Sequence, residues 1–497
     1  MVVRRMEDMV GREAEWQQMV DFATSGEESA SLGLVWGRRR IGKSFMLQGL
    51  AEQTNGFYYH AVRGSSGESL QDLGEQLGTH SGSLAPLSFG SWDDAVGALM
   101  ELGRRRETLV VLDEFPYMLE HTPALDSLVQ RAYAPRAGTR QDTQTRLVLC
   151  GSAMSVMGQL LTGTAPLRGR AALDLRMQPF DFRTARRLHG IEDFETAILT
   201  YAVIGGVAAY AREMVAHDLP SDPEDFNRWV SLRVLSPSAP LFGEVDLLFG
   251  EDPTMSKARK PNLYHSTLAG VALGNHAWSS LTNYVKIPGG SLASVVSALV
   301  SADFVAEVQD PVRHNRPMYQ PADPLIRFHY AIIRRHQARL RRHGADIGEL
   351  WAELTQTFRS QVLGPCFESM ARSWAMHFAS RGTLGGAPVH VGPTTLSVRN
   401  SDTGAREQRE LDVVVSAGDA ETPSHRTVTA IGEAKVGEHL SLRHLLRLEE
   451  ARKALGQVAD SAKLLLFGQH FETDVRRAAE ERDDVKIIDL PRLYEGE

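Results

Sequence analysis

The stretch VWGRRRIGKS, residues 35–44, constrains the fold of this chain more than any other part of its sequence. An apolar run precedes it and apolar residues at helical spacing follow it, so the pattern predicts a strand, a glycine-rich loop and a helix in that order. In this context Gly37 and Gly42 let the backbone wrap around a phosphate group, and amides at the start of the helix face the anion. Lys43 would reach the β- and γ-phosphates of a nucleotide, and the Ser44 hydroxyl would ligate Mg²⁺. The sequence therefore predicts a P-loop in an α/β fold.

An acidic pair stands where a P-loop protein needs a second element. In TLVVLDEFPYM, four apolar residues run directly into Asp113 and Glu114, at the expected end of another strand. Asp113 would hold Mg²⁺ through water, and Glu114 would orient or deprotonate the attacking water. A third apolar strand, RLVLCGS, ends at Ser152, whose hydroxyl could sense the γ-phosphate, although a plain Gly-Ser turn explains it equally well.

Length and composition bound the class of protein. At 497 residues the chain is too long for one ordinary core, so we expect two to four domains of roughly 100–200 residues. Two cysteines, Cys150 and Cys366, exclude a disulfide framework and favour a reducing compartment. No apolar run approaches the length of a membrane span, roughly 18–20 residues, and the N-terminal residues lack the apolar core of a signal peptide. We therefore expect a cytoplasmic protein without a membrane partner. A net charge of −8 argues against a generally basic nucleic-acid binder, although charge can be local.

Six motifs, collinear over roughly the first 210 residues, resemble the archaeal-type ATPases of archaea and bacteria. They are MVGREAEW, VWGRRRIGKS, VVLDEFPYM, VLCGSAMSVM, PLRGRAALDLRMQPFDF and YAVIGGVAAY. This family belongs to the AAA-related P-loop proteins, near the signal-transducing STAND group. The resemblance implies ATP and Mg²⁺ as cofactors, ATP hydrolysis, and a parallel sheet followed by a helical lid that starts near residues 180–216. It also makes Arg170 a candidate nucleotide contact, with a solvated loop arginine as the alternative, and Arg40 a position that is often basic in the family.

The sequence of the middle part of the chain predicts connecting segments followed by a winged helix. Residues 218–260 are rich in Pro, Asp and Ser, as expected of connecting segments. Three short helices and two strands follow, an order that the family commonly uses for a winged helix. The third helix carries serines but no residue suited to reading base edges, and only Arg313 and Arg316 on the wing suit phosphates. A structural or protein-docking role and a DNA-binding role both stay open.

The next segment, RFHYAIIRRHQARLRR, has six arginines and no acid. Such a run can contact nucleic-acid phosphates, form a solvated face, or pair with acids elsewhere in this net-negative chain.

The C-terminal part resembles the PD-(D/E)XK, or restriction-endonuclease-like, fold. A predicted helix carries Glu368, the strand ELDVVVS carries Asp412, and the strand IGEAKV places Glu433 and Lys435 on one face. By this resemblance, Asp412 and Glu433 would share one Mg²⁺, Glu368 would support the ligand shell, and Lys435 would position water or stabilise charge on phosphate. The sequence departs from the pattern because no proline precedes Asp412. A Glu433–Lys435 salt bridge without catalysis is the alternative.

These patterns together predict an α/β multidomain chain. We expect a P-loop ATPase core with a parallel sheet at residues 1–178, a helical lid and connection at 179–260, a winged helix at 261–325, and a nuclease-like α/β domain at 326–497. The expected function is ATP hydrolysis that controls a metal-dependent nuclease-like domain acting on DNA. A regulatory switch whose last domain only docks a partner is the main alternative, and a transcription regulator is a weaker one. The candidate partners are ATP, DNA, a second copy of this chain and another protein.

Overall fold

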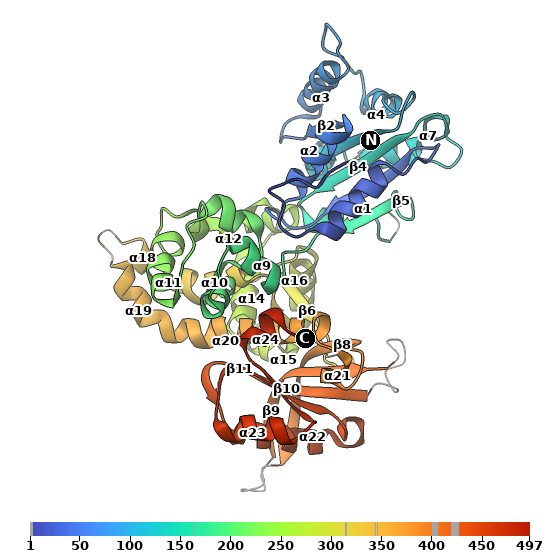
Figure 1. Ribbon diagram of the computed structural model, residues 1–497. Coiled ribbons are helices and arrows are strands. Elements are labelled where there is room, and N and C mark those ends of the chain that lie inside the picture. Colours follow the sequence, from blue (N-terminus) through green and yellow to red (C-terminus); the bar gives the residue numbers. More distant parts are fainter. Residues whose placement is uncertain are drawn as a thin grey trace. The chain divides into compact units, whose positions relative to one another are not determined.

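The computed structural model describes residues 3–163, 165–313, 316–342, 344, 346–399, 406–418 and 427–497. The chain divides into two compact units (Figure 1). The first comprises Met1–Pro179, Leu248–Ala258 and Ser301–Asp303, and the second comprises Phe180–Leu247, Arg259–Val300 and Phe304–Glu497. Because two short segments return to the first unit, the chain passes between the units five times.

The first unit is built on a five-stranded sheet with the order β2-β3-β4-β1-β5. All neighbouring strands in it pair in parallel. The strands are β1 (Ser31–Trp36), β2 (Phe57–His60), β3 (Thr108–Asp113), β4 (Thr145–Gly151) and β5 (Ala171–Arg176). The helices are α1 (Glu13–Ala23), α2 (Lys43–Thr54), α3 (Ser66–His80), α4 (Trp92–Glu101), α5 (Phe115–His121), α6 (Leu125–Ala132), α7 (Gly138–Gln141) and α8 (Met154–Met157). The predicted parallel α/β core is confirmed.

The central strands of this sheet are buried along their whole length. Every residue of β3 and β4 is buried, which is the pattern of strands covered on both faces. Their Leu and Val side chains join helices α3 to α6 in one apolar core. The predicted motifs lie where β1, β3 and β4 end, and the carboxyl ends of parallel strands meet at one edge of a sheet.

Helices dominate the first part of the second unit. They are α9 (Phe182–His189), α10 (Phe194–Ile204), the π-helical turns η1 (Tyr210–Met214) and η2 (Val230–Val234), α11 (Pro223–Trp229) and α12 (Pro240–Glu251). Helix α12 begins in the second unit and ends in the first, where α13 (Pro253–Ser256) follows it.

The expectation of connecting segments at residues 218–260 is wrong, because most of that stretch is helical. Its Asp and Pro residues start helices instead of breaking them. Asp222 accepts backbone N–H groups at the start of α11 with Pro223 in the first turn, and Asp252 and Pro253 do the same for α13. These are the preferred residues of the N-cap and the first helical position.

The predicted three helices and two strands are present in the second unit. They are α14 (Pro261–Ala272), α15 (Trp278–Val285), α16 (Gly289–Ser301), β6 (Val305–Val308) and β7 (Met318–Pro321), and the two strands pair antiparallel. Leu292, Val296 and Leu299 are the buried side of α16, while Ser291 and Ser297 are exposed. Arg316 on the loop between the strands is exposed, and residues 314 and 315 of that loop lie outside the described residues.

Two of the six arginines in the arginine-rich run pair with acids of this chain. The run forms the end of α17 (Pro324–Phe328), the π-helical turn η3 (His329–Ile333) and α18 (Arg334–Leu340). Arg327 is buried, Arg334 lies 3.4 Å from Asp246, and Arg339 lies 2.9 Å from Glu353. These contacts favour the interpretation in which the run balances acids of this chain.

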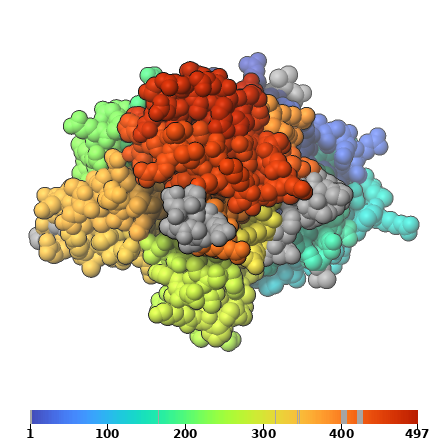
Figure 2. Space-filling view, turned by 90° about the horizontal axis from the view of Figure 1, so that it is seen from below, coloured from blue at the N-terminus to red at the C-terminus, as the bar shows by residue number. Residues whose placement is uncertain are grey.

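The C-terminal part of the second unit holds a mixed sheet with the order β12-β11-β10-β9-β8. Strands β8, β9 and β10 pair antiparallel, and β10, β11 and β12 pair parallel. The strands are β8 (His390–Arg399), β9 (Arg406–Ala417), β10 (Thr427–Leu440), β11 (Lys463–Phe471) and β12 (Val485–Ile488). The helices are α19 (Ile347–Phe358), α20 (Gly364–His377), α21 (Arg381–Leu384), α22 (Leu442–Leu455), α23 (Thr473–Glu481) and α24 (Leu490–Glu495), with the π-helical turn η4 (Arg359–Leu363) and the 3₁₀ turn η6 (Gly456–Ala459). In Figure 2 the residues of β9 to β12, coloured dark orange to red, form one continuous mass.

Candidate functional site

The loop between β1 and α2 has the backbone that its glycines predict. Gly37 has φ 153° and Gly42 has φ 97°, values that side chains with a Cβ rarely adopt. A Cβ on Gly37 would also lie 2.4 Å from the carbonyl oxygen of Met177. Arg40 adopts a left-handed φ of 69° at the turn of the loop. The loop can therefore curve around an anion of phosphate size.

Lys43 lies inside this loop. Its Nζ donates to the carbonyl oxygens of Gly37 and Arg38, at 2.8 Å each, and the residue is only 5% exposed. Burial lowers the pKa of Lys43, although the carboxylates of Glu114 and Asp113 oppose the shift. The ammonium is thus held by backbone oxygens at the place where the sequence predicts phosphate binding.

Asp113 ends β3 with its carboxylate almost fully enclosed at 1% exposure. Oδ2 accepts from Tyr58 Oη at 2.6 Å and lies 3.4 Å from His60 Nδ1, while Oδ1 accepts from the backbone N–H of Glu114 at 2.9 Å. Burial alone would raise the pKa of Asp113, but hydrogen bonds with His60 and other neighbours, Ser44 among them, lower it below its usual range. The carboxylate is therefore ionised at neutral pH.

Glu114 and Ser152 lie together. Ser152 Oγ donates to both carboxylate oxygens of Glu114, at 2.9 and 3.0 Å. Glu114 itself has a left-handed φ of 53° at the start of α5, which turns its side chain out of the strand direction. Glu114 directly follows β3 and Ser152 directly follows β4, so the parallel pairing of these two strands brings the predicted base and the predicted sensor into contact.

The donor chemistry at this edge of the sheet suits Mg²⁺. Ser44 lies in the first turn of α2 and Asp113 ends β3, and both supply oxygen, the ligand that Mg²⁺ prefers. Among the described residues there is no group of three or more His, Cys, Asp or Glu side chains that could hold a metal alone. Mg²⁺ is commonly held by one or two carboxylates together with substrate phosphates and water. When bound, such a cation would neutralise charge on the phosphates.

The C-terminal sheet brings together three of the four residues predicted there. Lys435 Nζ lies 3.1 Å from Asp412 Oδ2 and 3.0 Å from Glu433 Oε1. Asp412 Oδ2 also accepts the backbone N–H of Ala434 at 2.9 Å. Asp412 and Glu433 are each 6% exposed. Two carboxylates in this arrangement suit a hard cation, and the Lys435 ammonium already lies within ion-pair distance of both.

Glu368 takes a different place from the other three. It lies on α20, which packs against β9 and β10, but no hydrogen bond joins it to Asp412, Glu433 or Lys435 among the described residues. Burial and then the Asp412 charge raise the pKa of Glu368 to about 7. Arg372, one turn further along α20, donates to the Asp412 carbonyl oxygen at 2.9 Å. Glu368 is thus near the charge of Asp412 without contacting it.

Comparison with known proteins assigns the first of these sites. Residues 9–197 match a family described as an ATPase domain predominantly from Archaea. These residues form an archaeal-type ATPase domain. The match spans the P-loop, Asp113, Glu114 and Ser152, and it confirms the predicted ATPase. It does not reach the C-terminal sheet, so the nuclease-like resemblance of that sheet stays a prediction.

Individual relatives cover more of the chain. An uncharacterized protein of Methanocaldococcus jannaschii, MJECL04, is 24% identical over 355 residues, which are 71% of this chain and 74% of the relative. The Walker-type ATPase PABY2304 of Pyrococcus abyssi is 20% identical, with a TM-score of 0.47 over 66% of this chain and 97% of that one. The Aeropyrum pernix ORC2 protein, solved as ADPNP and ADP complexes, is 12% identical, with a TM-score of 0.38 over 72% and 96% of the two chains.

Arginines around the P-loop of the ATPase domain pair with acids of the two returning segments. Arg39 lies 2.7 Å from Glu251, and Arg38 lies 4.0 Å from Asp303. Arg170, the predicted nucleotide contact, donates from Nε to the carbonyl oxygen of Pro166 at 3.3 Å, within its own turn. Its contact with nucleotide stays a prediction.

Sequence reasoning missed Tyr58, His60 and Glu251. The first two lie on β2, whose sequence FYYH carries no motif, and Glu251 is more than 200 residues from the P-loop. The contacts of these three residues depend on which strands and segments lie side by side in the folded protein. Alternation along β2 was the one available signal, since it predicts that Tyr58 and His60 share a face.

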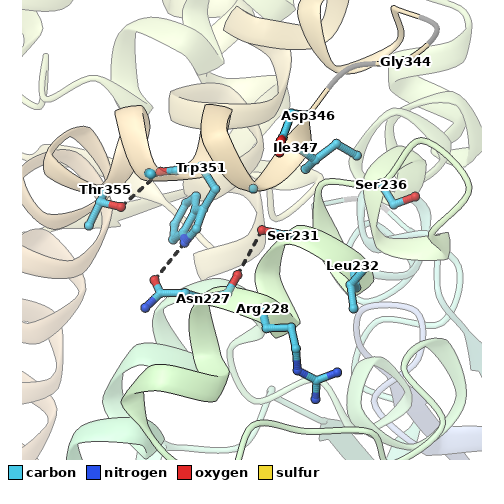
Figure 3. A pocket seen from close by; sticks show the side chains of 12 residues that line it. Asn227, Arg228, Ser231, Leu232, Ser236, Gly344, Asp346, Ile347, Trp351 and Thr355 are labelled. Atoms are coloured by element: carbon cyan, nitrogen blue, oxygen red, sulfur yellow. Dashed lines mark hydrogen bonds between the residues drawn. The ribbon is translucent and has the colours of Figure 1, made fainter.

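A groove in the second unit lies between α11, η2 and α19 (Figure 3). Its polar groups are largely bonded to the protein itself. Trp351 Nε1 donates to Asn227 Oδ1 at 2.9 Å, and Asp346 accepts the backbone N–H of Glu349 at the start of α19. These polar side chains in the groove are therefore already paired within the protein.

Among the described residues, no single helix is both long and apolar enough to cross a membrane. Helices α15 and α16 meet that criterion only as a pair, and they are bent by 108° relative to each other.

Proposed function

We propose that the ATPase domain binds ATP–Mg²⁺ through Lys43, Ser44 and Asp113, and that Glu114 orients the attacking water. The supporting observation is the contact of Glu114 with Ser152 beside an ionised Asp113 and a buried Lys43. The backbone of Gly37 and Gly42 and the residues Arg40 and Arg170 would complete the nucleotide site. Hydrolysis then depends on positioning and on charge stabilisation, as in other phosphoryl transfers.

Lys43→Ala should abolish ATP turnover, because it removes the ammonium group that would reach the β- and γ-phosphates. The matched control is Lys257→Ala, which removes a lysine of the same unit that pairs with Glu120 on the surface at 3.1 Å. Hydrolysis by the Lys43 variant at the native rate would refute the assigned role.

We further propose that the nucleotide state controls a C-terminal metal-dependent nuclease-like site acting on DNA. The observation that carries this proposal is the pairing of two buried carboxylates, Asp412 and Glu433, with one lysine. Such carboxylates can hold Mg²⁺ or Mn²⁺, and Lys435 can stabilise charge that develops on a phosphate. Glu368 would act at longer range through its charge. The winged helix at 261–325 and the lid at 179–260 would lie between the two sites in sequence.

A second candidate is an ATP-dependent regulatory switch in which the C-terminal domain, residues 326–497, is catalytically silent. Lys435 already forms an ion pair with both Asp412 and Glu433, as in a structural ion-pair network. In this case the domain would dock a protein partner or a second copy. For both candidate functions the expected location is the cytoplasm. Free cysteines are usual in that reducing compartment, and Cys150 and Cys366 are both free and buried.

Nuclease assays separate the two candidates. Native protein, Asp412→Asn and Lys435→Ala would be incubated with single- and double-stranded DNA and Mg²⁺ or Mn²⁺, with and without ATP. Asp483→Asn is the matched control, because Asp483 is an exposed acid of the same sheet region. Cleavage lost in both site variants but kept in the control would support a nuclease, and dependence on ATP would support coupling. No cleavage with intact ATP hydrolysis would favour the regulatory switch.

A further inference from the structure

The Tyr58 hydroxyl contacts Asp113, one of the two side chains expected to hold Mg²⁺. Its oxygen is 2.6 Å from Asp113 Oδ2, the shortest of the contacts described for that carboxylate. A phenol from β2 therefore holds the aspartate that ends the neighbouring strand β3.

The sheet fixes this placement. Strand β2 runs parallel to β3 with His60 beside Asp113 and Tyr58 beside Val111. Because side chains alternate along a strand, Tyr58 and His60 project to the same face, and both reach Asp113 Oδ2. Tyr59 between them projects to the other face, where its hydroxyl donates to the Ser69 carbonyl oxygen at 3.3 Å.

Tyr58 can serve only as a hydrogen-bond donor to the carboxylate. A phenol has an ordinary pKa of about 10, so Tyr58 carries its proton at neutral pH and donates it to Asp113 Oδ2. Asp113 Oδ1 is meanwhile fixed by the backbone N–H of Glu114 at 2.9 Å. Donors on both oxygens leave the carboxylate a narrow range of orientations.

We propose that Tyr58 is a positioning residue of the ATPase, which orients Asp113 toward the nucleotide-bound Mg²⁺. His60 assists from the half-exposed end of the same strand, with 52% of its side chain exposed. This inference rests on the proposed roles of Ser44 and Asp113. Partners of this kind fix the orientation of a metal ligand, and their removal typically weakens metal affinity about 10- to 100-fold.

Tyr58→Phe tests the proposal, with Tyr59→Phe as the matched control. Each variant removes one hydroxyl from the same strand, but only the first removes a hydrogen bond to Asp113. The measurements are the Mg²⁺ concentration for half-maximal ATP hydrolysis, the affinity for a fluorescent ATP analogue in Mg²⁺ and in EDTA, and the melting temperature.

We expect Tyr58→Phe to raise the half-maximal Mg²⁺ concentration about 10-fold and to weaken analogue binding in Mg²⁺ but not in EDTA. Tyr59→Phe should leave the Mg²⁺ dependence unchanged. An unchanged Mg²⁺ dependence in Tyr58→Phe, or an equal loss of binding in EDTA, would overturn the proposal. If the native protein itself shows no Mg²⁺ dependence, the proposed metal ligands fail instead.

A second variant tests the proposal in case Tyr58→Phe does not fold. His60→Ala changes a half-exposed side chain and should keep the fold while shifting the Mg²⁺ dependence in the same direction by a smaller factor. If Tyr58→Phe does not fold and His60→Ala titrates Mg²⁺ like the native protein, the proposal is refuted.

Discussion

Lys435→Met should loosen the C-terminal sheet, because it removes the cation shared by two buried carboxylates. Breaking a buried pair by removing one partner costs about 3–5 kcal/mol, since the remaining charge has no compensation. Lys435 keeps 28% of its side chain exposed, so water screens part of this cost and we expect the lower end, about 3 kcal/mol. At about 1.4 kcal/mol for each factor of ten, this predicts roughly 100-fold faster amide exchange.

Hydrogen exchange of peptides from β9 and β10 measures this change directly, because it reports local opening. Lys486→Met is the control, since its partner Asp483 is 86% exposed and the pair should contribute less than about 1 kcal/mol. Added Mg²⁺ or Mn²⁺ should slow exchange again in Lys435→Met if Asp412 and Glu433 can bind a metal. Native-like exchange in Lys435→Met would refute the argument that this lysine balances the two charges, and failure of both cations to restore protection would count against a metal site.

Three further predictions concern the ATPase domain and the acid range. Glu114→Gln should lower kcat for ATP by about 100-fold or more while nucleotide affinity stays within about 2-fold; an equal loss of affinity would contradict a water-positioning role. Glu251→Gln should tighten ATP binding about 2- to 5-fold at low salt, because it frees Arg39 from its ion pair, and weaker binding would contradict this. Burial lowers the pKa of His189 from 6.5 to about 4, so the unfolded state binds a proton that the folded state excludes, and stability should fall as pH drops from 6.5 to 4. His189→Leu should flatten that slope in acid unfolding curves, and an unchanged slope would show that other groups set it.

The local elements of this chain could be predicted from its sequence, whereas the contacts between distant elements could not. The P-loop lysine and Asp113 follow apolar strands, and those strands formed where the pattern placed them. The Asp and Pro residues at 222–223 and 252–253 start helices within a stretch whose composition predicts connecting segments, because residues that favour helix starts also favour turns. The contact of Tyr58 with Asp113 depends on β2 lying next to β3, which depends on strand order and not on any local pattern. The same is true of Arg39 and Glu251.

The return of two short segments to the first unit affects how the ATPase domain can be isolated. A fragment that ends at Pro179 would keep every nucleotide-binding motif but would lack Leu248–Ala258 and Ser301–Asp303. Arg38, Arg39 and Arg176 would then lose the carboxylates of Asp303 and Glu251, and Ser155 would lose its bond to Asp252. Such a truncated ATPase would carry a higher net positive charge beside its P-loop, because two nearby carboxylates would be missing. Its affinity for anions would therefore differ from that of the full-length protein, even with an unchanged fold.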